Sequence, residues 1–246
     1  MHLMKKSKVK ADVQAEGDEM TRAARAFFEA GGFAAQTAGV AAEVSRALSR
    51  CPDLGGARHI LNAGCGEGAY LRLLEREQAQ LWGTDQSKLA VRYAAKRQPA
   101  ARFAVASPHR LPFADGSFDV VFSVFAPAPW EEFCRVLRPG GAIIVARAGA
   151  THLQELRARA GAHETAPREP KEFSAGLAEN YGRLRSAEVL SGALAGRLLE
   201  MTPFVRHASP HMRRELEAAE ELPVTVDFII STHRVWLGAA GGRFEL

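Results

Sequence analysis

The sequence feature that most constrains the fold is a short apolar run that ends in three closely spaced glycines. Residues 60–68 have the sequence ILNAGCGEG, so Gly64, Gly66 and Gly68 follow the run at intervals of two residues. Glycine accepts positive φ angles and lets a ligand approach the main chain, and the first amides of a following helix have no partner inside that helix. The stretch therefore predicts a buried strand that turns into a helix around a ligand.

An acidic residue after the next apolar run indicates the kind of ligand. Asp85 lies 17 positions after Gly68 and ends the stretch QLWGTD at residues 80–85. In a doubly wound sheet this spacing puts a carboxylate at the end of the neighbouring strand, where it can accept hydrogen bonds from both hydroxyls of a ribose. The two motifs together predict a cofactor of the adenosine type.

Strands and helices alternate from residue 58 onward, which is typical of a mostly parallel sheet with right-handed crossovers. Residues 118–124 are apolar enough to form a central strand that is covered on both faces. The expected strands are residues 59–63, 80–83, 102–105, 118–124, 142–145 and 224–230, the last one antiparallel to the others. The expected helices between them are residues 70–77, 88–97 and 130–137.

The flanking regions depart from this alternation. Helices are expected at residues 21–31 and 36–49 before the sheet, and at residues 186–199, capped by Ser186, and 210–221 after it. The expected division is residues 1–55 as an N-terminal helical segment that caps the site or pads the sheet, 56–148 as the cofactor-binding core, 149–204 as a lid-like insertion, and 205–246 as the completion of the sheet.

Composition excludes several classes of protein. The 246 residues carry 32 basic and 28 acidic side chains interspersed along the chain, so the net charge of +4 does not indicate a concentrated nucleic-acid surface. The cysteines Cys51, Cys65 and Cys134 follow neither a disulfide pattern nor a metal-binding pattern, and no metal is expected. No apolar run approaches the roughly 20 residues that span a bilayer, so a cytoplasmic protein without a membrane partner is expected.

Two further motifs identify the type of fold. The sequence LPFADGSFD at residues 111–119 leads into the fourth strand, and LRPGG at residues 137–141 precedes the fifth. With the glycine turn and Asp85 before them, they resemble the class I S-adenosylmethionine (SAM)-dependent methyltransferases. The resemblance implies a Rossmann-like sheet and SAM, either as methyl donor or as substrate.

The resemblance extends over nearly the whole chain. Residues 21–31, 106–113, 125–127 and 200–204 are similar to the bacterial large-subunit rRNA guanine-N1 methyltransferases. That family normally carries an N-terminal zinc module with four cysteines, whereas the first cysteine here is Cys51. Similar proteins without the module occur in natural-product pathways, among them the enzymes that cyclise SAM to azetidine-2-carboxylate and release methylthioadenosine.

Three functions follow from these resemblances. The preferred one is a SAM-dependent enzyme of small-molecule metabolism, which transfers an alkyl group from the sulfonium to a small acceptor or cyclises SAM itself. The alternatives are an rRNA guanine-N1 methyltransferase, with RNA as its partner, and a non-catalytic SAM-binding protein. The sequence does not indicate the acceptor or the oligomeric state.

The resemblance also assigns roles to individual residues. Because a sulfonium activates its adjacent carbons, the protein mainly positions and desolvates, and no acid–base triad is expected. Phe125 follows the fourth strand, where the methyl acceptor normally lies, and Tyr181 matches an aromatic position of the rRNA enzymes; an aromatic face can stabilise a cation. The histidines after residue 149 share no ligand spacing. The cofactor contacts implied by the resemblance are Asn62, Gly64, Gly66, Glu67, Gly68, Asp85, Gln86, Ser107 and His109.

Overall fold

The computed structural model describes residues 17–162 and 179–235. These residues divide into two compact units, which are described separately. The core unit comprises the described residues within Phe33–His152, Ala166–Ser186 and Val226–Leu246. The accessory unit comprises those within Met1–Gly32, Leu153–Thr165 and Ala187–Thr225.

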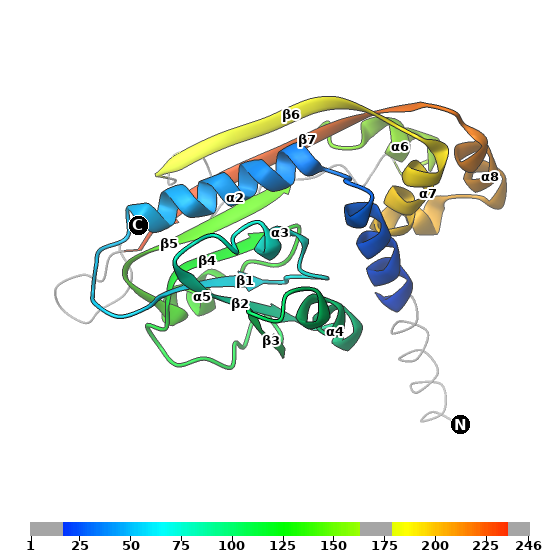
Figure 1. Cartoon of the computed structure of the whole chain (residues 1–246). Coiled ribbons are helices and arrows are strands. Elements are labelled where there is room, and N and C mark those ends of the chain that lie inside the picture. Colours follow the sequence, from blue (N-terminus) through cyan, green and yellow to red (C-terminus); the bar gives the residue numbers. More distant parts are fainter. Residues whose placement is uncertain (1–16, 163–178, 236–246) are drawn as a thin grey trace, which may run out of the picture. The chain divides into compact units, whose positions relative to one another are not determined.

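A seven-stranded sheet in the order β3-β2-β1-β4-β5-β7-β6 runs through the described residues (Figure 1). The first five strands are parallel, and β7 is antiparallel to β5, with Ala142 opposite Arg234 and Ala148 opposite Phe228. This arrangement confirms the predicted Rossmann-like class, with its antiparallel C-terminal strand. The strands are β1 (Arg58–Ala63), β2 (Ala79–Asp85), β3 (Arg102–Val105), β4 (Phe118–Val124), β5 (Leu137–Ala148), β6 (Asn180–Leu190) and β7 (Leu222–Arg234).

Helices cover both faces of the sheet in the core unit, which explains why all seven residues of β4 are buried. The helices are α2 (Ala34–Ser49), α3 (Ala69–Arg72), α4 (Lys88–Arg97) and α5 (Trp130–Val136). On one face, Glu43 of α2 accepts hydrogen bonds from Thr232 of β7 and Asn180 of β6. On the other face, Phe133 of α5 joins a buried cluster with Leu61, Val121 and Ile143.

The boundaries of α4 show how local sequence sets an element of the core. The Ser87 hydroxyl accepts a hydrogen bond from the Ala90 amide at 3.2 Å, so Ser87 is the N-cap of the helix. Gln98 precedes Pro99, and the residue before a proline is disfavoured in a helical conformation. The helix therefore spans the predicted residues, Lys88–Arg97.

The accessory unit is mainly helical. Residues 17–29 form a helix, and α6 (Gln154–Arg159), α7 (Gly192–Glu200), a 3₁₀ helix η4 (Pro203–His207) and α8 (Pro210–Ala218) follow. Ser191 and Ser209 cap α7 and α8 through hydrogen bonds from the backbone amides of Leu194 and Met212. None of the helices in the described part of the chain is long and apolar enough to cross a membrane.

The predicted start of the helix over residues 186–199 was wrong. Residues Asn180–Leu190 form β6, and the helix begins only at Gly192, with Ser191 rather than Ser186 as its N-cap. Exposure alternates along β6 with a period of two residues, as expected for a strand, and the Ser186 hydroxyl accepts a hydrogen bond from Gln36 of α2 at 2.6 Å. Pairing with β7 therefore overrides the helical preference of this stretch.

Other predicted boundaries also shift. The predicted helix at residues 70–77 ends at Arg72 and continues as turns, whereas β5 begins five residues before its predicted start and ends at Ala148. Residues 163–178 of the predicted lid-like insertion lie outside the described residues, as do residues 1–16 of the N-terminal segment and the end of the chain from residue 236.

Candidate active site

The glycine turn lies at the carboxyl end of β1 in the core unit. Gly64, Gly66 and Gly68 all have positive φ angles, of 78°, 54° and 91°. The amides of Gly64 and Cys65 both donate to the carbonyl oxygen of Thr84, at 2.8 Å, which fixes the turn against the end of β2. A Cβ atom at Gly64 would collide with the side chain of Ala126. The turn thus requires glycine at Gly64, both for its backbone angle and for lack of space.

Asp85 lies directly against this turn. Its Oδ2 accepts a hydrogen bond from the Gly66 amide at 2.9 Å, and its Oδ1 accepts one from the Ser87 amide at 2.8 Å. Each carboxylate oxygen can accept a second hydrogen bond. The structure therefore brings together the two motifs from which the sequence predicts a ribose site.

A buried amide at the end of β1 fits a polar cofactor. The Asn62 side chain is only 1% exposed, and neither its oxygen nor its nitrogen has a hydrogen-bond partner among the described residues. Leaving a buried polar group unsatisfied costs about 1–3 kcal/mol. A ligand with donors and acceptors beside the glycine turn would remove this cost.

The remaining predicted cofactor residues surround the same end of the sheet. Glu67 is buried and forms an ion pair with Arg97 of α4, while Gln86 is exposed just after Asp85. Ser107 and His109 lie in the turn after β3, where the His109 amide donates to the Ser107 hydroxyl at 3.3 Å. The turn is anchored beside Asp85, because the amide of Ala106 donates to the Asp85 carbonyl oxygen at 3.0 Å.

Four rings form an aromatic group at the carboxyl ends of β4 and β5. Phe125 stacks on His152, with ring centroids 5.3 Å apart and planes 25° apart, and packs edge-on against Phe228 at 4.6 Å. Phe33, which precedes α2, contacts both His152 and Phe228. Phe125 is 44% exposed and has a positive φ of 52°. Phe125, which is predicted to lie beside the methyl acceptor, thus packs against the rings of His152 and Phe228, and Phe33 packs against both of these rings.

A buried carboxylate lies on the other face of β7, next to this aromatic group. Because successive side chains of a strand point to opposite faces, the side chains of Asp227 and Phe228 lie on opposite faces of β7. Both oxygens of Asp227 bind the Arg183 guanidinium, at 2.6 and 2.7 Å, and Thr151 donates to Oδ2 through its amide and its hydroxyl. The Arg183 guanidinium and the Thr151 donors hold the pKa of Asp227 well below its ordinary value.

Tyr181 lies outside the aromatic group. It is 38% exposed on β6, two residues before Arg183 and therefore on the same face of the strand. The structure thus connects the strand of Tyr181 to the strand of Phe228 through the ion pair between Arg183 and Asp227.

Three residues of this region, His152, Asp227 and Arg183, are not predictable as site residues from local sequence motifs. They are up to 75 positions apart, and no local spacing relates them. One signal was available: Asp227 is the only charged residue in the apolar run VTVDFII at residues 224–230. A carboxylate in a buried strand needs a partner, so this residue marks a polar site inside the sheet.

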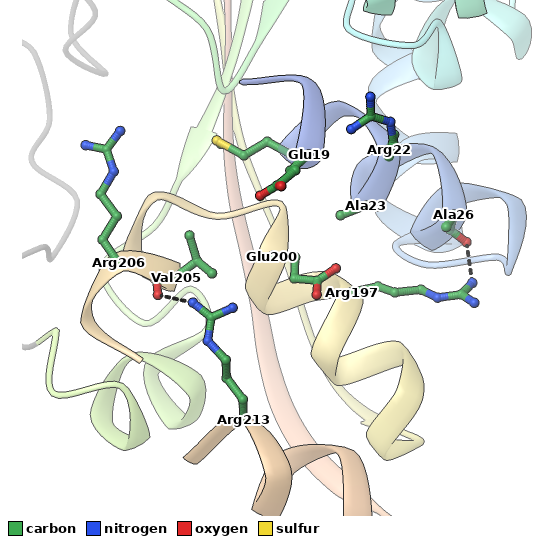
Figure 2. Close-up of a pocket in the computed structure, with 10 residues that line it drawn as sticks. Glu19, Arg22, Ala23, Ala26, Arg197, Glu200, Val205, Arg206 and Arg213 are labelled. Carbon is green, nitrogen blue, oxygen red and sulfur yellow. Dashed lines mark hydrogen bonds between the residues drawn. The ribbon is translucent and has the colours of Figure 1, made fainter. Parts of the chain in front are cut away.

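A separate cavity of about 460 Å³ lies within the accessory unit (Figure 2). Its wall carries Arg22, Arg197, Glu200 and Arg213, and none of the residues predicted to bind the cofactor. Arg213 donates to the carbonyl oxygen of Val205 at 2.9 Å, so it also stabilises η4. The cavity is therefore distinct from the residues predicted to bind the cofactor. No cluster of three or more potential metal ligands occurs within residues 17–162 and 179–235.

Comparisons with known proteins agree with this geometry. Residues 61–145 match a family model described as a methyltransferase domain. The YcgJ protein from Bacillus subtilis, a solved structure, aligns with a TM-score of 0.50 at 18% identity, covering 79% of this chain and 100% of that one. The chain is 32% identical over 229 residues to the 23S rRNA (guanine(748)-N(1))-methyltransferase of Streptomyces fradiae, covering 88% of this chain and 80% of that protein. It is also 31% identical over 104 residues to the malonyl-[acyl-carrier protein] O-methyltransferase of Serratia marcescens, covering 39% and 41% of the two chains.

The fold, the glycine turn and these matches define a SAM-dependent class I methyltransferase, with SAM as its cofactor. Within that class, the chain belongs to the family of the 23S rRNA guanine-N1 methyltransferases.

Proposed function

We propose that the enzyme alkylates an amine, either the α-amine of SAM itself or the amine of a small molecule. In this proposal the alkyl acceptor would lie next to Phe125, at the carboxyl ends of β4 and β5, which we call the acceptor end. The observation that carries the proposal is the hydrogen bonding of the two titratable side chains there, His152 and Asp227. Nδ1 of His152 already accepts a hydrogen bond and the pKa of Asp227 is lowered, which favours an acceptor that needs no strong base from the protein.

His152 has one ring nitrogen occupied. Its Nδ1 accepts a hydrogen bond from the backbone amide of Asp227 at 3.2 Å. A neutral histidine that accepts at Nδ1 carries its proton on Nε2, which then acts as a donor. Asp227 has a lowered pKa because of Arg183 and Thr151, so its carboxylate is also a poor proton acceptor.

An amine nucleophile suits such a site. The α-amino group of a peptide has a pKa of about 7.7–8.0, and an amine of similar basicity is partly unprotonated near neutral pH. The ring nitrogen N1 of guanine, in contrast, carries a proton that must be removed. The site as described supplies a surface for positioning and desolvation rather than a strong base.

Two reactions are compatible with this proposal, the cyclisation of SAM and methyl transfer to an external amine. In cyclisation, the α-amine nitrogen of SAM attacks its own γ-carbon, the bond from that carbon to sulfur breaks, and the nitrogen loses a proton to water. The products are azetidine-2-carboxylate and methylthioadenosine. In methyl transfer, the nitrogen of an external amine attacks the methyl carbon, the bond from that carbon to sulfur breaks, S-adenosylhomocysteine leaves, and the nitrogen loses a proton to water. Phe125 would face the sulfonium in either case, where its ring can stabilise the positive charge.

The proposed cofactor contacts follow from the position of each group. The glycine turn and Asn62 would hold the methionine part and the ribose, and Asp85 would accept hydrogen bonds from the ribose hydroxyls. Glu67 would act at the rim of the turn together with its partner Arg97. Gln86, Ser107 and His109 would lie near the adenine.

A second candidate function is the methylation of guanine N1 in ribosomal RNA. It is favoured by the similarity to the Streptomyces fradiae enzyme, whose name states this activity and of which the chain covers 80%. RNA binding would require a phosphate-binding surface in addition to the glycine turn.

The test is to incubate the purified protein with SAM in three mixtures: alone, with a panel of primary amines, and with ribosomal RNA. The proposal predicts methylthioadenosine and azetidine-2-carboxylate in the first mixture, or S-adenosylhomocysteine and an N-methylated amine in the second. Methylthioadenosine must exceed the amount formed without protein. Product that forms only with RNA would overturn the proposal in favour of the second candidate, and no product in any mixture would also overturn it.

A further inference from the structure

We infer that Arg183 and Asp227 are positioning residues that set the tautomer and orientation of His152, and that His152 in turn holds Phe125 at the acceptor end. The inference rests on the proposed function in one respect only, which is that the alkyl acceptor lies next to Phe125. The three contacts that link Arg183 to Phe125 all lie within the core unit.

The first contact fixes Asp227. Its side chain is fully buried, and its two oxygens accept four hydrogen bonds, two from Arg183 and two from Thr151. A bidentate guanidinium–carboxylate pair is specific in geometry as well as strong. The backbone of Asp227 is also held, because its carbonyl oxygen accepts the Gly149 amide at 2.8 Å. A Cβ at Gly149 would collide with the Asp227 carboxylate, so the turn after β5 closes tightly on it.

The second contact fixes His152. The Asp227 amide donates to Nδ1 at 3.2 Å, and the His152 amide donates to the Gly149 carbonyl oxygen at 3.0 Å. Ring orientation and backbone are thus both tied to the same turn. Because Nδ1 accepts, the neutral ring presents Nε2–H as its donor.

The third contact fixes Phe125. A non-glycine residue with positive φ is strained, and such strain persists only where the surroundings over-determine the conformation. The parallel ring of His152 and the edge contact with Phe228 provide that restraint. Phe125 would otherwise be free to leave the acceptor end, since 44% of its surface is exposed.

A purely stabilising role does not explain this arrangement. Replacing a buried ion pair with well-packed apolar residues is often neutral or stabilising, so such a pair is weak evidence for stability. In this site the pair fixes one backbone amide, that of Asp227, and through this amide the state of a histidine ring. We therefore expect its loss to affect turnover more than cofactor binding.

The test compares Arg183→Lys with Arg185→Lys. Arg185 is exposed on the same face of β6, two residues further along, which makes it a matched control. Lysine keeps the charge but cannot form the bidentate pair. We expect Arg183→Lys to lower kcat for SAM consumption by about two- to fivefold, no more than removal of the Phe125 ring itself, because Arg183 acts only through the position of that ring. The KM for SAM and the kcat of the control variant should stay at the wild-type value within the error of the assay.

Two substitutions of His152 separate its two contacts. His152→Asn retains an acceptor for the Asp227 amide but loses the ring, whereas His152→Phe retains a ring for stacking but loses the acceptor. We expect a fall in kcat in both variants, because positioning needs both contacts. Thermal unfolding and SAM binding are measured in parallel, so that a folding defect is recognised.

Nitrogen NMR of histidine-labelled protein tests the inference independently of the reaction. We expect the wild-type His152 signal to show an unprotonated Nδ1 and a protonated Nε2, and we expect this signature to change in Arg183→Lys. A protonated Nδ1 in neutral wild-type His152, or equal kcat values for the two lysine variants, would overturn the inference. Because the tautomer is measured without turnover, a failure here is distinguishable from a failure of the proposed amine alkylation.

Discussion

The glycine turn and the aromatic group are both at the carboxyl ends of the central strands, but they are built in different ways. The turn depends on the main chain: positive φ angles at Gly64, Gly66 and Gly68, and backbone amides that meet Thr84 and Asp85. The aromatic group depends on side chains that come from four separate segments of the chain. A site made by the backbone tolerates little change at one position, whereas a site made by side chains loses function in graded steps.

The largest effect is expected for Gly64→Ala. Both the positive φ of 78° and the collision with Ala126 oppose a side chain at this position, so SAM affinity should fall by about 100-fold or more. Isothermal titration calorimetry measures the affinity. Gly55→Ala is the matched control, because Gly55 has a φ of 77° but nothing within 4 Å of its Cβ position. Equal effects of the two substitutions would show that backbone strain alone, rather than the turn's packing, governs binding.

Asp227→Asn is expected to have the next largest effect, on stability. The folded-state pKa of Asp227 is lowered by Arg183, so its contribution is present above the unfolded-state pKa of about 3.9 and is lost as pH falls below that value. At pH 7 the variant should unfold several degrees below wild type, and the difference should shrink progressively as the pH falls from about 5 toward the lowered folded-state pKa of Asp227. Asp115→Asn is the control, since Asp115 also pairs with an arginine, Arg135, but is exposed. A difference that does not depend on pH would contradict this account of Asp227.

Asp85→Ala should weaken SAM binding by at least about 1 kcal/mol, through loss of hydrogen bonds to a charged group. The control is Asp53→Ala, because the Asp53 carboxylate also accepts a backbone amide, from Gly55 at 3.0 Å, in an exposed turn. Calorimetry on both variants gives the difference. Unchanged affinity in Asp85→Ala would show that the ribose lies elsewhere.

The smallest effect is expected for Phe125→Leu. Stabilisation of a cation by an exposed aromatic face contributes about 0.5–1 kcal/mol, so kcat should fall by about two- to fivefold while SAM affinity changes little. Phe125→Tyr retains the ring and should stay close to wild type in a steady-state assay. If both variants lose the same activity, the ring face is not what matters at this position.

The same contrast explains how much of the molecule could be predicted from the sequence. The glycine turn, Asp85, β4 and α4 depend on local signals, such as the Ser87 cap and a continuous apolar run, and the structure places these elements as predicted. Residues 186–190 of β6 were predicted as the start of a helix because their alanine and glutamate residues favour helices, and only pairing with β7 shows their alternation.

The aromatic group was only partly predictable, because it too depends on contacts between residues that are far apart in the sequence. Phe125 has a recognisable position after β4, but its partners His152 and Phe228 lie far along the chain. The pairing of β5 with β7 puts Phe228 opposite Ala148, close to His152, and no spacing in the sequence encodes that register. Long-range pairing therefore sets the arrangement of the aromatic group.

The central claim, that an amine accepts the alkyl group, is tested most directly by following the methyl carbon of SAM. The protein is incubated with SAM carrying ¹³C in its methyl group, together with ribosomal RNA and a mixture of small amines, and the labelled products are identified by NMR and mass spectrometry. Our account predicts that the label remains on sulfur in methylthioadenosine or moves to the nitrogen of an amine. Label on N1 of guanine in the RNA would contradict it.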